Sequence, residues 1–341
     1  MLNNKSILVT GATGSFGKAF VRAVLERYSP SRLIIFSRDE LKQYDMAHEL
    51  KVEEHPCLRY FIGDVRDLPR LRRAMQGVDY VVHAAAMKHV PIAEYNPFEC
   101  IRTNIGGAEN VINAAIDAKV KKVIALSTDK AANPLNLYGA TKLASDKCFI
   151  AANHMGGSDG TRFSVVRYGN VIGSRGSVVE YFSKLVADGA TELPVTDMRM
   201  TRFWITLQQG VDFVIDRLAA MTGGELFIPK IASMKLTDLA RSIGPDCTLK
   251  EVGIRPGEKL HEVLLPRDEA RHALEFRNHY TVEPAFSWWC RDEHLVEGGE
   301  AGRPVPEGFE YSSECNTDWI HDGDLEALIK TPSTETPVSV G

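Results

Sequence analysis

Short apolar runs alternate with segments of helical periodicity along the first half of the chain. The runs cover residues 6–10, 32–37, 58–63, 78–83, 122–127 and 163–168. Apolar runs of this length are typical of strands buried inside a sheet. After the first run, apolar side chains recur on one helical face, at Phe16, Ala19, Phe20, Ala23 and Val24. Strands that alternate with helices predict an α/β fold with a doubly wound, parallel, Rossmann-like sheet.

The alternation fades after residue 168, which predicts a change of domain. Residues 1–168, together with about 203–222, are expected to form the cofactor-binding domain. We expect a smaller C-terminal lobe, formed by residues 169–202 and 223–330, to bind the substrate. The sequence there contains Arg, Asn and Glu in loops that Gly and Pro mark. A short helix is expected near 322–329, and the Pro-, Thr- and Ser-rich residues 331–341 are expected to be a mobile tail. Residues 280–310 give no clear prediction.

Composition narrows the class of protein. The 341 residues are 44% hydrophobic and 25% charged, as in soluble globular proteins. The net charge of -5 gives no reason to expect nucleic acid or an anionic membrane as a partner. No apolar run reaches the ~20 residues that a membrane span needs. The six Cys are widely spaced without a CxxC pair, which favours a reduced, cytoplasmic protein and no metal site.

A glycine-rich turn joins the first predicted strand to the first helix. Its spacing is Gly-x-x-Gly-x-x-Gly, over residues 11–17. Backbone N–H groups at a helix start suit a pyrophosphate. A purely structural turn could also need three glycines, but the strand–turn–helix context favours a dinucleotide. The predicted cofactor contacts of this turn are Gly11, Thr13, Gly14, Ser15, Phe16 and Gly17.

The end of the second predicted strand bears on the choice between NAD and NADP. An NAD site would place an acidic residue here, on the ribose 2′-hydroxyl. This chain has Ser37 and Arg38 instead, with Lys42 a turn later. A hydroxyl and two cations suit a 2′-phosphate, so we predict NADP. Asp39 keeps NAD open as the alternative.

Further candidates follow the third and fourth strands. Asp64 could contact the adenine or cap the next helix. Small residues after the fourth strand would let a cofactor approach the backbone, and Lys88 at the tip of that loop is interpreted as a ligand contact rather than a surface lysine. His83 is expected to serve packing. The predicted cofactor contacts here are Asp64, Val65, Ala84 and Ala86.

The fifth strand leads to two acid/base pairs. Tyr138 and Lys142 are four residues apart and share a helix face. The Lys142 ammonium can lower the pKa of Tyr138, favouring a phenolate that takes a proton from a sugar hydroxyl. Asp129 and Lys130, next to Thr128, form the second pair. One pair suffices for a simple dehydrogenase, so two pairs indicate redox chemistry plus another step.

These motifs carry a family resemblance. Thr10-Gly-x-x-Gly-x-x-Gly17 with Tyr138-x-x-x-Lys142 resembles the extended short-chain dehydrogenase/reductase superfamily, over roughly residues 5–265. A narrower resemblance is to the UDP-N-acetylglucosamine 4,6-dehydratases, especially the short, C5-inverting enzymes that start pseudaminic acid synthesis. The segments that carry it are 127–134, 138–142, 167–171 and 255–259.

Two features separate the chain from neighbouring families. Enzymes that dehydrate dTDP-glucose carry Thr-Asp-Glu where this chain has Thr128, Asp129 and Lys130. The long, membrane-anchored retaining dehydratases typically lack the tyrosine kept here as Tyr138.

The resemblance implies a mechanism and roles for single residues. Tyr138, with Lys142 and Thr128, would remove the C4 hydroxyl proton while hydride passes to NADP⁺. Lys130 would be the base at C5, and Asp129 the acid that protonates the departing C6 hydroxyl. Hydride would return to C6 and a proton would be delivered to C5 on the opposite face, giving UDP-2-acetamido-2,6-dideoxy-β-L-arabino-hex-4-ulose. The implied contacts to the UDP-sugar are Lys88, Asn170, Arg202, Arg255 and Glu258.

The resemblance also implies a homo-oligomer, with a hexamer as one arrangement. Two other functions stay open at this point. A nucleotide-sugar C4 epimerase would share the glycine-rich turn and the Tyr138/Lys142 pair but has no need of Asp129 and Lys130. The presence of Tyr138, Lys142 and Asp129 argues against a non-catalytic NADP-binding regulator.

Overall fold

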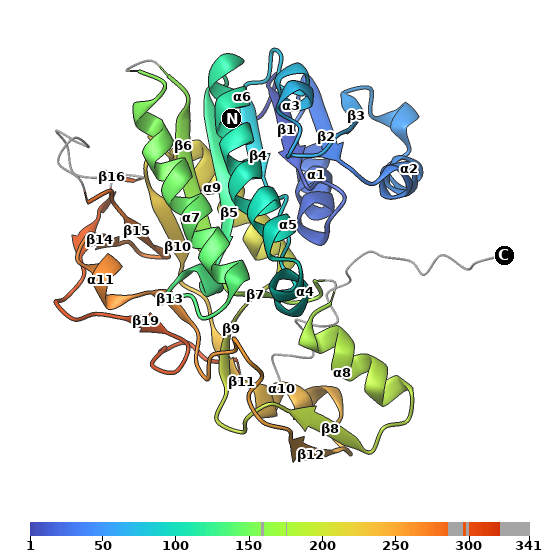
Figure 1. Cartoon of the computed structure of the whole chain (residues 1–341), viewed down its shortest axis with the longest axis vertical. Helices are drawn as coiled ribbons and strands as arrows, with labels where there is room; N and C mark the ends of the chain where they lie inside the picture. Colours follow the sequence, from blue (N-terminus) through green and yellow to red (C-terminus); the bar gives the residue numbers. More distant parts are fainter. Residues whose placement is uncertain (158–159, 175, 286–295, 298–299, 321–341) are drawn as a thin grey trace. The chain divides into compact units, whose positions relative to one another are not determined.

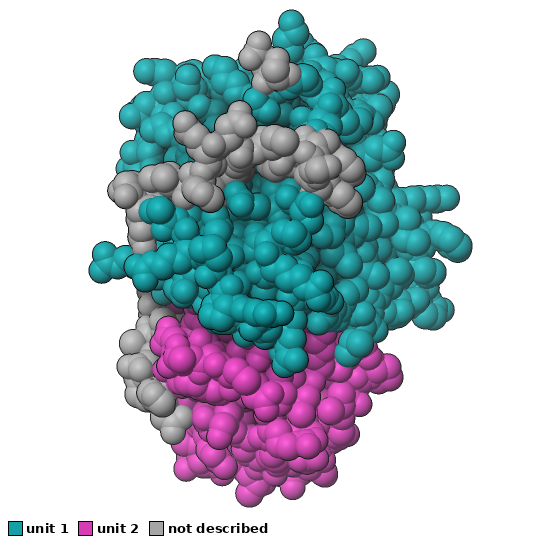
Figure 2. Space-filling view, turned by 90° about the vertical axis from the view of Figure 1, so that its left-hand side faces the viewer, with its two compact units in different colours: residues 1–168, 208–230, 263–311 teal, residues 169–207, 231–262, 312–341 magenta. Residues whose placement is uncertain are grey.

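The computed structural model describes residues 1–157, 160–174, 176–285, 296–297 and 300–320. The chain divides into two compact units, coloured separately in Figure 2. The first unit comprises residues 1–168, 208–230 and 263–311. The second comprises residues 169–207, 231–262 and 312–341. The short helix expected near 322–329 and the tail expected at 331–341 lie outside the described residues.

A ten-stranded sheet forms the centre of the first unit, in the order β18-β14-β15-β10-β6-β5-β4-β1-β2-β3. All pairings from β3 across to β10 are parallel. The strands are β1 (Ser6–Thr10), β2 (Arg32–Ser37), β3 (Leu58–Ile62), β4 (Tyr80–His83), β5 (Lys122–Thr128), β6 (Arg162–Tyr168), β10 (Leu226–Pro229), β14 (Ala273–Glu275), β15 (His279–Val282) and β18 (Arg303–Pro304). The order 3-2-1-4-5-6 within this sheet confirms the predicted doubly wound, Rossmann-like fold.

Helices pack on both faces of this sheet. In Figure 1, α6 and α7 cover the face turned to the viewer and α9 lies behind the strands. Their buried faces follow the apolar periodicity, and α1, for example, buries Phe20, Val21 and Val24. The helices are α1 (Ser15–Arg27), α2 (Glu40–Glu49), α3 (Leu68–Ala74), α4 (Val90–Tyr95), α5 (Pro97–Ile101), α6 (Gly107–Asp117), α7 (Leu137–Ala151), α9 (Leu207–Ala220) and α11 (Arg267–Ala270).

Side-chain caps set where several of these helices begin. The Asp39 carboxylate accepts from the backbone N–H of Lys42 at the start of α2. At the start of α7, the Asn136 side chain accepts from the N–H of Gly139. Both satisfy an N–H group that has no partner inside its helix. The cap at Asn136 fixes the first turn of α7, which carries Tyr138.

After residue 202, the domain boundaries predicted from the sequence differ from the boundaries of the two units. The prediction gave 223–330 to the substrate lobe, yet 263–311 belong to the first unit. The reason is that β10 pairs with β6, and β15 and β14 then add antiparallel strands to the same sheet. These strands are three or four residues long, so they leave no run of apolar residues for a pattern to detect.

The second unit is a smaller α/β body with its own core. It contains a three-stranded sheet, β11-β9-β7, and a parallel pair, β12-β8. The core packs Phe182 of α8, Leu193 of β8 and Trp204 of β9 with Met234 and Leu239. The elements are β7 (Asn170–Val171), α8 (Val178–Ala187), β8 (Glu192–Val195), β9 (Thr201–Ile205), β11 (Ser233–Lys235), α10 (Leu236–Ile243) and β12 (Thr248–Glu251).

The remaining short strands are β13 (Val263–Leu265), β16 (Val296–Glu297), β17 (Glu300–Ala301) and β19 (Tyr311–Ser312).

Among the described residues, no helix combines the length and apolar character that crossing a membrane requires. The same residues contain no group of three or more His, Cys, Asp or Glu side chains placed to hold a metal ion.

Candidate active site

The glycine-rich turn between β1 and α1 requires its glycines for steric reasons. Gly11 has φ +66°, and a Cβ there would lie 2.8 Å from the backbone nitrogen of Ala85. A Cβ on Gly17 would lie 2.4 Å from the Cα of Ala12. Both distances are shorter than any real carbon contact, so the turn packs backbone against backbone.

The start of α1 fits the pyrophosphate of a dinucleotide. The helix is preceded by Gly14, which offers no side-chain cap to the first N–H groups. Phe16 in the first turn is half-buried and stacks on Tyr168 with ring centroids 6.5 Å apart. An uncapped helix start behind a close-packed glycine turn is a favourable anion site. Dinucleotide binding at Gly11, Gly14 and Gly17 stays a prediction.

A side-chain hydrogen bond between Thr10 and His83 connects the carboxyl ends of β1 and β4. The Thr10 hydroxyl lies 2.8 Å from Nδ1 of His83 and also accepts from the N–H of Ala85 at 3.3 Å. Burial, with a smaller contribution from the Lys142 charge, lowers the pKa of His83 to about 3. His83 is therefore a neutral packing residue, as its sequence context predicts. These contacts fix the start of the loop that holds Ala84 and Ala86.

The ribose end of the predicted cofactor site lies at the carboxyl end of β2. Ser37 is buried and accepts a hydrogen bond from the Thr13 hydroxyl at 3.0 Å. The Arg38 side chain is 65% exposed, with its guanidinium 3.9 Å from Asp64. Lys42 is paired with Asp39 at 2.8 Å. Ser37, Arg38 and Lys42 are thus near one another in the fold, and both cations have a carboxylate neighbour.

Asp64 and Val65 follow β3. Two nitrogens of Arg66 donate to the Asp64 carboxylate, at 2.7 and 3.1 Å. Burial raises the pKa of Asp64, but the hydrogen bonds and charge of Arg66 outweigh it and leave that pKa lowered. Val65 is buried against α6, where its Cγ2 would lie 2.8 Å from a Cβ on Gly107. Val65 therefore shapes the site through packing.

Tyr138 and Lys142 lie on the first turns of α7, and both are buried. Tyr138 is 9% exposed and packs with Ala93 and Cys100. Burial raises the pKa of Tyr138 to about 12, while the Lys130 charge and a hydrogen bond with Thr128 act in the opposite direction. The expectation of a lowered pKa for Tyr138 is therefore not met in the free protein, because burial prevails over the Lys130 charge and the Thr128 hydrogen bond. The contribution expected of Lys142 stays a prediction.

The tight turn after β5 brings the second acid/base pair beside Tyr138. The turn begins at Asp129, whose side chain is fully buried. Its Oδ1 accepts from the Thr128 hydroxyl at 2.9 Å and from the Lys130 ammonium at 3.0 Å. Its Oδ2 is buried and has no hydrogen-bond partner within the described chain. Thr128, Asp129, Lys130 and Tyr138 are therefore one cluster in the first unit.

A positioning residue that the sequence did not reveal is Asn104. It lies in a π-helical turn, Arg102–Gly106, between α5 and α6. Its side chain exchanges two hydrogen bonds with the backbone of Met87, at 2.8 and 3.0 Å, and donates to the Thr141 hydroxyl at 3.0 Å. Asn104 thereby ties the loop carrying Lys88 to α7. An Asn inside a helical pattern gives no signal of this, although π-turns often mark functional sites.

The predicted sugar-nucleotide contacts fall in both units. Lys88 belongs to the first unit and is exposed. In the second unit, the Arg202 guanidinium donates to the carbonyls of Thr201 and Lys259, at 2.7 and 3.0 Å. Arg202 therefore organises the segment before Leu260. The others are Asn170 on β7, half-buried, and Arg255 and Glu258 on the loop after β12, where the Arg255 N–H donates to Glu258 at 3.4 Å.

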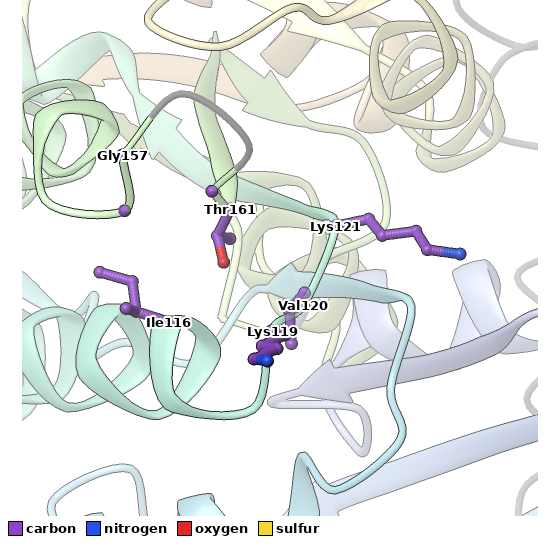
Figure 3. A pocket seen from close by; sticks show the side chains of 8 residues that line it. Ile116, Lys119, Val120, Lys121, Gly157 and Thr161 are labelled. Carbon is purple, nitrogen blue, oxygen red and sulfur yellow. The ribbon is translucent and has the colours of Figure 1, made fainter.

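A separate hollow of about 690 Å³ opens at the amino ends of β5 and β6 (Figure 3). Its lining includes Ile116, Lys119 and Thr161. Lys121, also in the lining, pairs with Asp79 at 2.7 Å. Ligands of doubly wound sheets bind beyond the carboxyl ends of the strands, so this hollow is at the wrong edge for the predicted chemistry.

The fold, the glycine-rich turn between β1 and α1, and the Tyr138/Lys142 pair on α7 define an extended short-chain dehydrogenase/reductase. Within that class, the chain belongs to the family described as polysaccharide biosynthesis protein, whose model matches residues 7–284.

Two curated relatives bear on the reaction type. The chain is 57% identical over 331 residues to UDP-N-acetylglucosamine 4,6-dehydratase (inverting) of Campylobacter jejuni subsp. jejuni serotype O:2, covering 96% of this chain and 98% of the relative. It is 41% identical to UDP-glucose 4-epimerase of Rickettsia rickettsii, covering 83% and 84%. The predicted resemblance to the inverting dehydratases, which are hydro-lyases, is confirmed.

Solved structures agree with the fold. Pen from Bacillus thuringiensis matches with a TM-score of 0.85 and 36% identity, over 96% of this chain and 98% of that one. The dTDP-glucose 4,6-dehydratase DesIV from Streptomyces venezuelae, described with NAD bound, matches with a TM-score of 0.65 and 25% identity, over 75% and 86%.

Proposed function

We propose that this protein converts UDP-N-acetylglucosamine into UDP-2-acetamido-2,6-dideoxy-β-L-arabino-hex-4-ulose, by 4,6-dehydration with inversion at C5. The observation that carries the proposal is the cluster at the carboxyl end of β5. A redox tyrosine, Tyr138, stands beside a buried carboxyl, Asp129, that is hydrogen-bonded to a lysine, Lys130. The inverting dehydratase that is 57% identical to this chain supports the same reaction.

Tyr138 and its neighbours handle the C4 hydroxyl in this proposal. A bound nicotinamide would supply the hydride acceptor for C4 and the hydride donor for C6. Tyr138 takes the hydroxyl proton as a phenolate, which its hydrogen bond with Thr128 and the Lys130 charge favour. The raised pKa of Tyr138 in the free protein means that additional positive charge is needed when substrate reacts, and Lys142 on the same helix supplies it.

Asp129 and Lys130 carry out the elimination. The C4 ketone acidifies the C5 hydrogen, which Lys130 removes as a neutral amine. Asp129 donates a proton to the C6 hydroxyl as it leaves as water. Return of the hydride to C6 and delivery of a proton to C5 from the opposite face then complete the product and invert C5. The unpartnered Oδ2 of Asp129 supports this role, because a buried carboxyl oxygen without a protein partner is available to a substrate hydroxyl.

The proposed cofactor is NADP, held by the turn at Gly11–Gly17 and, at its 2′-phosphate, by Ser37, Arg38 and Lys42. The exposed Arg38 guanidinium supports this choice, since its planar fork suits a phosphate. The second unit is proposed to bind the UDP-sugar through Asn170, Arg202, Arg255 and Glu258, together with Lys88 of the first unit.

The proposed setting is a cytoplasmic homo-oligomer, with a hexamer as one arrangement, that supplies pseudaminic acid synthesis. Large apolar side chains support self-association, because Tyr95 is 87% and Phe98 is 72% exposed on neighbouring helices α4 and α5. The described cysteines are all free thiols, which supports a reducing compartment.

The rival function is a nucleotide-sugar C4 epimerase, which the 41% identity to UDP-glucose 4-epimerase supports. Mass spectrometry separates the two functions. Purified protein given UDP-N-acetylglucosamine and NADP⁺ should yield a product lighter by one water, whereas an epimer is isobaric with the substrate. Protein that binds NADP and leaves every UDP-sugar unchanged would instead favour a non-catalytic regulator.

A further inference from the structure

Three charged side chains, Asp146, Arg167 and Glu269, form a cluster inside the first unit, called here the Asp146 cluster. Asp146 and Arg167 are almost completely buried, with side chains 2% and 0% exposed. Arg167 lies 2.5 Å from Glu269 and 3.6 Å from Asp146. Buried charges are costly unless they are paired, so a cluster at this depth requires a physical account.

Lys142 connects this cluster to the proposed chemistry. Asp146 follows Lys142 by one helical turn on α7, so the two side chains share a helix face. Lys142 is only 3% exposed. Burial lowers the pKa of Lys142, and the Asp146 charge acts against that effect. Asp146 is thus the counter-charge that favours the ammonium form of Lys142.

The rest of the cluster holds Asp146 in place. Ser127 at the end of β5 donates to its Oδ2 at 2.6 Å. Burial raises the pKa of Asp146, while the Lys142 and Arg167 charges oppose the rise. Arg167 is itself anchored by Glu269 of α11 and by the carbonyl of Leu264 at 3.1 Å. Oδ1 of Asp146 is buried and accepts no hydrogen bond within the described part of the chain.

We propose that Asp146 is a positioning residue for the reaction: its carboxylate keeps Lys142 protonated on the helix that carries Tyr138, and Arg167, which Glu269 anchors, keeps that carboxylate fixed and charged. The inference rests on the proposed role of Tyr138 as the base at the C4 hydroxyl. A neutral Lys142 could not stabilise a phenolate, so loss of the Asp146 charge would remove electrostatic support without touching the substrate.

Other groups that act on Lys142 do not provide this counter-charge. His83 on β4 is neutral. Tyr138, on the same helix as Lys142, is protonated in the free protein. Arg167 is a cation, and the Glu269 carboxylate is hydrogen-bonded to its guanidinium. Asp146 is therefore the residue whose negative charge and position on α7 suit it to keep Lys142 protonated.

The first test reads the protonation of Lys142 directly, without substrate. The ¹³Cε resonances of labelled lysines are titrated in the full-length protein, and Lys142 is assigned with Lys142→Met. In Asp146→Asn, Lys142 should titrate lower by ~1 unit or more. Asp146→Glu should restore most of the shift, and Ser127→Ala, which keeps the charge, should leave it nearly unchanged. An unchanged Lys142 titration in Asp146→Asn would overturn the proposal.

The second test is the pH dependence of turnover. Asp146→Asn should lose ~10-fold or more in kcat at pH 9 and much less at pH 6, with KM little changed, because Lys142 regains its proton in acid. A loss of equal size at every pH would indicate a structural role only and contradict the proposal.

The variant Glu269→Gln tests the same proposal without changing Asp146. It removes one of the two carboxylate charges that pair with Arg167, so Lys142 should again titrate lower, by a smaller amount. No shift in this variant would also contradict the proposal. If the wild-type protein fails to dehydrate UDP-N-acetylglucosamine, the proposed function falls, yet the lysine titration still decides the role of Asp146.

Discussion

The Lys130 ammonium donates a hydrogen bond to Oδ1 of Asp129 over 3.0 Å. In the proposed elimination, the Asp129 carboxyl must give a proton and the Lys130 amine must take one. Transfer of one proton along this contact creates both forms together, with no change in the total charge of the pair. The acid and the base can therefore be prepared in one step.

Lys130→Ala tests the base role. The variant should lose ~10²–10⁴-fold in deuterium exchange at C5 of the sugar, because it lacks the amine that is hydrogen-bonded to Asp129, while UDP-sugar binding stays close to wild type. Product NMR in deuterated water measures the exchange, and calorimetry measures the binding. Lys250→Ala is a suitable control, since Lys250 is 67% exposed and pairs with Glu192 in the second unit. Rapid exchange in Lys130→Ala would remove Lys130 from the base role.

Arg38→Ala tests the choice of cofactor. If the guanidinium binds the 2′-phosphate, the variant should weaken NADP by ~10-fold or more and leave NAD nearly unaffected, because only NADP carries that group. Fluorescence titration with each dinucleotide measures both affinities. Arg59→Ala, on β3, is the control for loss of one surface cation. Equal losses for NADP and NAD would undermine the 2′-phosphate argument.

Gly11→Ala tests the close approach at the glycine-rich turn. Its Cβ would meet the backbone of Ala85 at 2.8 Å in a residue with φ +66°. We expect a loss of ~1–3 kcal/mol in the free energy of unfolding, and loss of dinucleotide binding. Gly106→Ala is the matched control, because a Cβ there has no neighbour within 4 Å. Urea unfolding of both variants that gave equal stability would contradict the packing described here.

His83 predicts a pH dependence of stability. Its pKa is about 3 in the folded protein and 6.5 as the unperturbed value, so below pH 6.5 the unfolded chain binds a proton that the folded chain does not. Stability should therefore fall with decreasing pH, by ~1.4 kcal/mol per unit from this residue. Urea unfolding between pH 5 and 7 should show a shallower fall in His83→Asn. Parallel curves for the two proteins would contradict a buried, neutral His83.

Much of the first unit could be predicted from the sequence. Apolar runs located β1 to β6 within two residues of their observed ends, since a buried parallel strand must be apolar on both faces. The position of the glycine-rich turn between β1 and α1 likewise follows from the strand–turn–helix pattern. The short antiparallel strands β14, β15 and β18 could not be predicted, because two to four residues carry no periodicity.

The properties that depend on burial were not accessible from the sequence. Asp146 follows Lys142 by four residues, a spacing equally typical of an exposed helical ion pair, and Glu269 is distant in sequence. Only the fold brings Arg167 between the two carboxylates. The pKa of Tyr138 was predicted in the wrong direction for the same reason, since its burial depends on residues from α4 and α5.

The most direct test of the central claim is NMR and mass analysis of the product formed from UDP-N-acetylglucosamine in deuterated water, with a trace of NADP⁺. The account predicts a 4-keto-6-deoxy sugar, lighter by one water before isotope correction, with deuterium at an inverted C5 and no net gain of NADPH absorbance. An isobaric C4 epimer without deuterium at C5, or NADPH that accumulates with turnover, would contradict it.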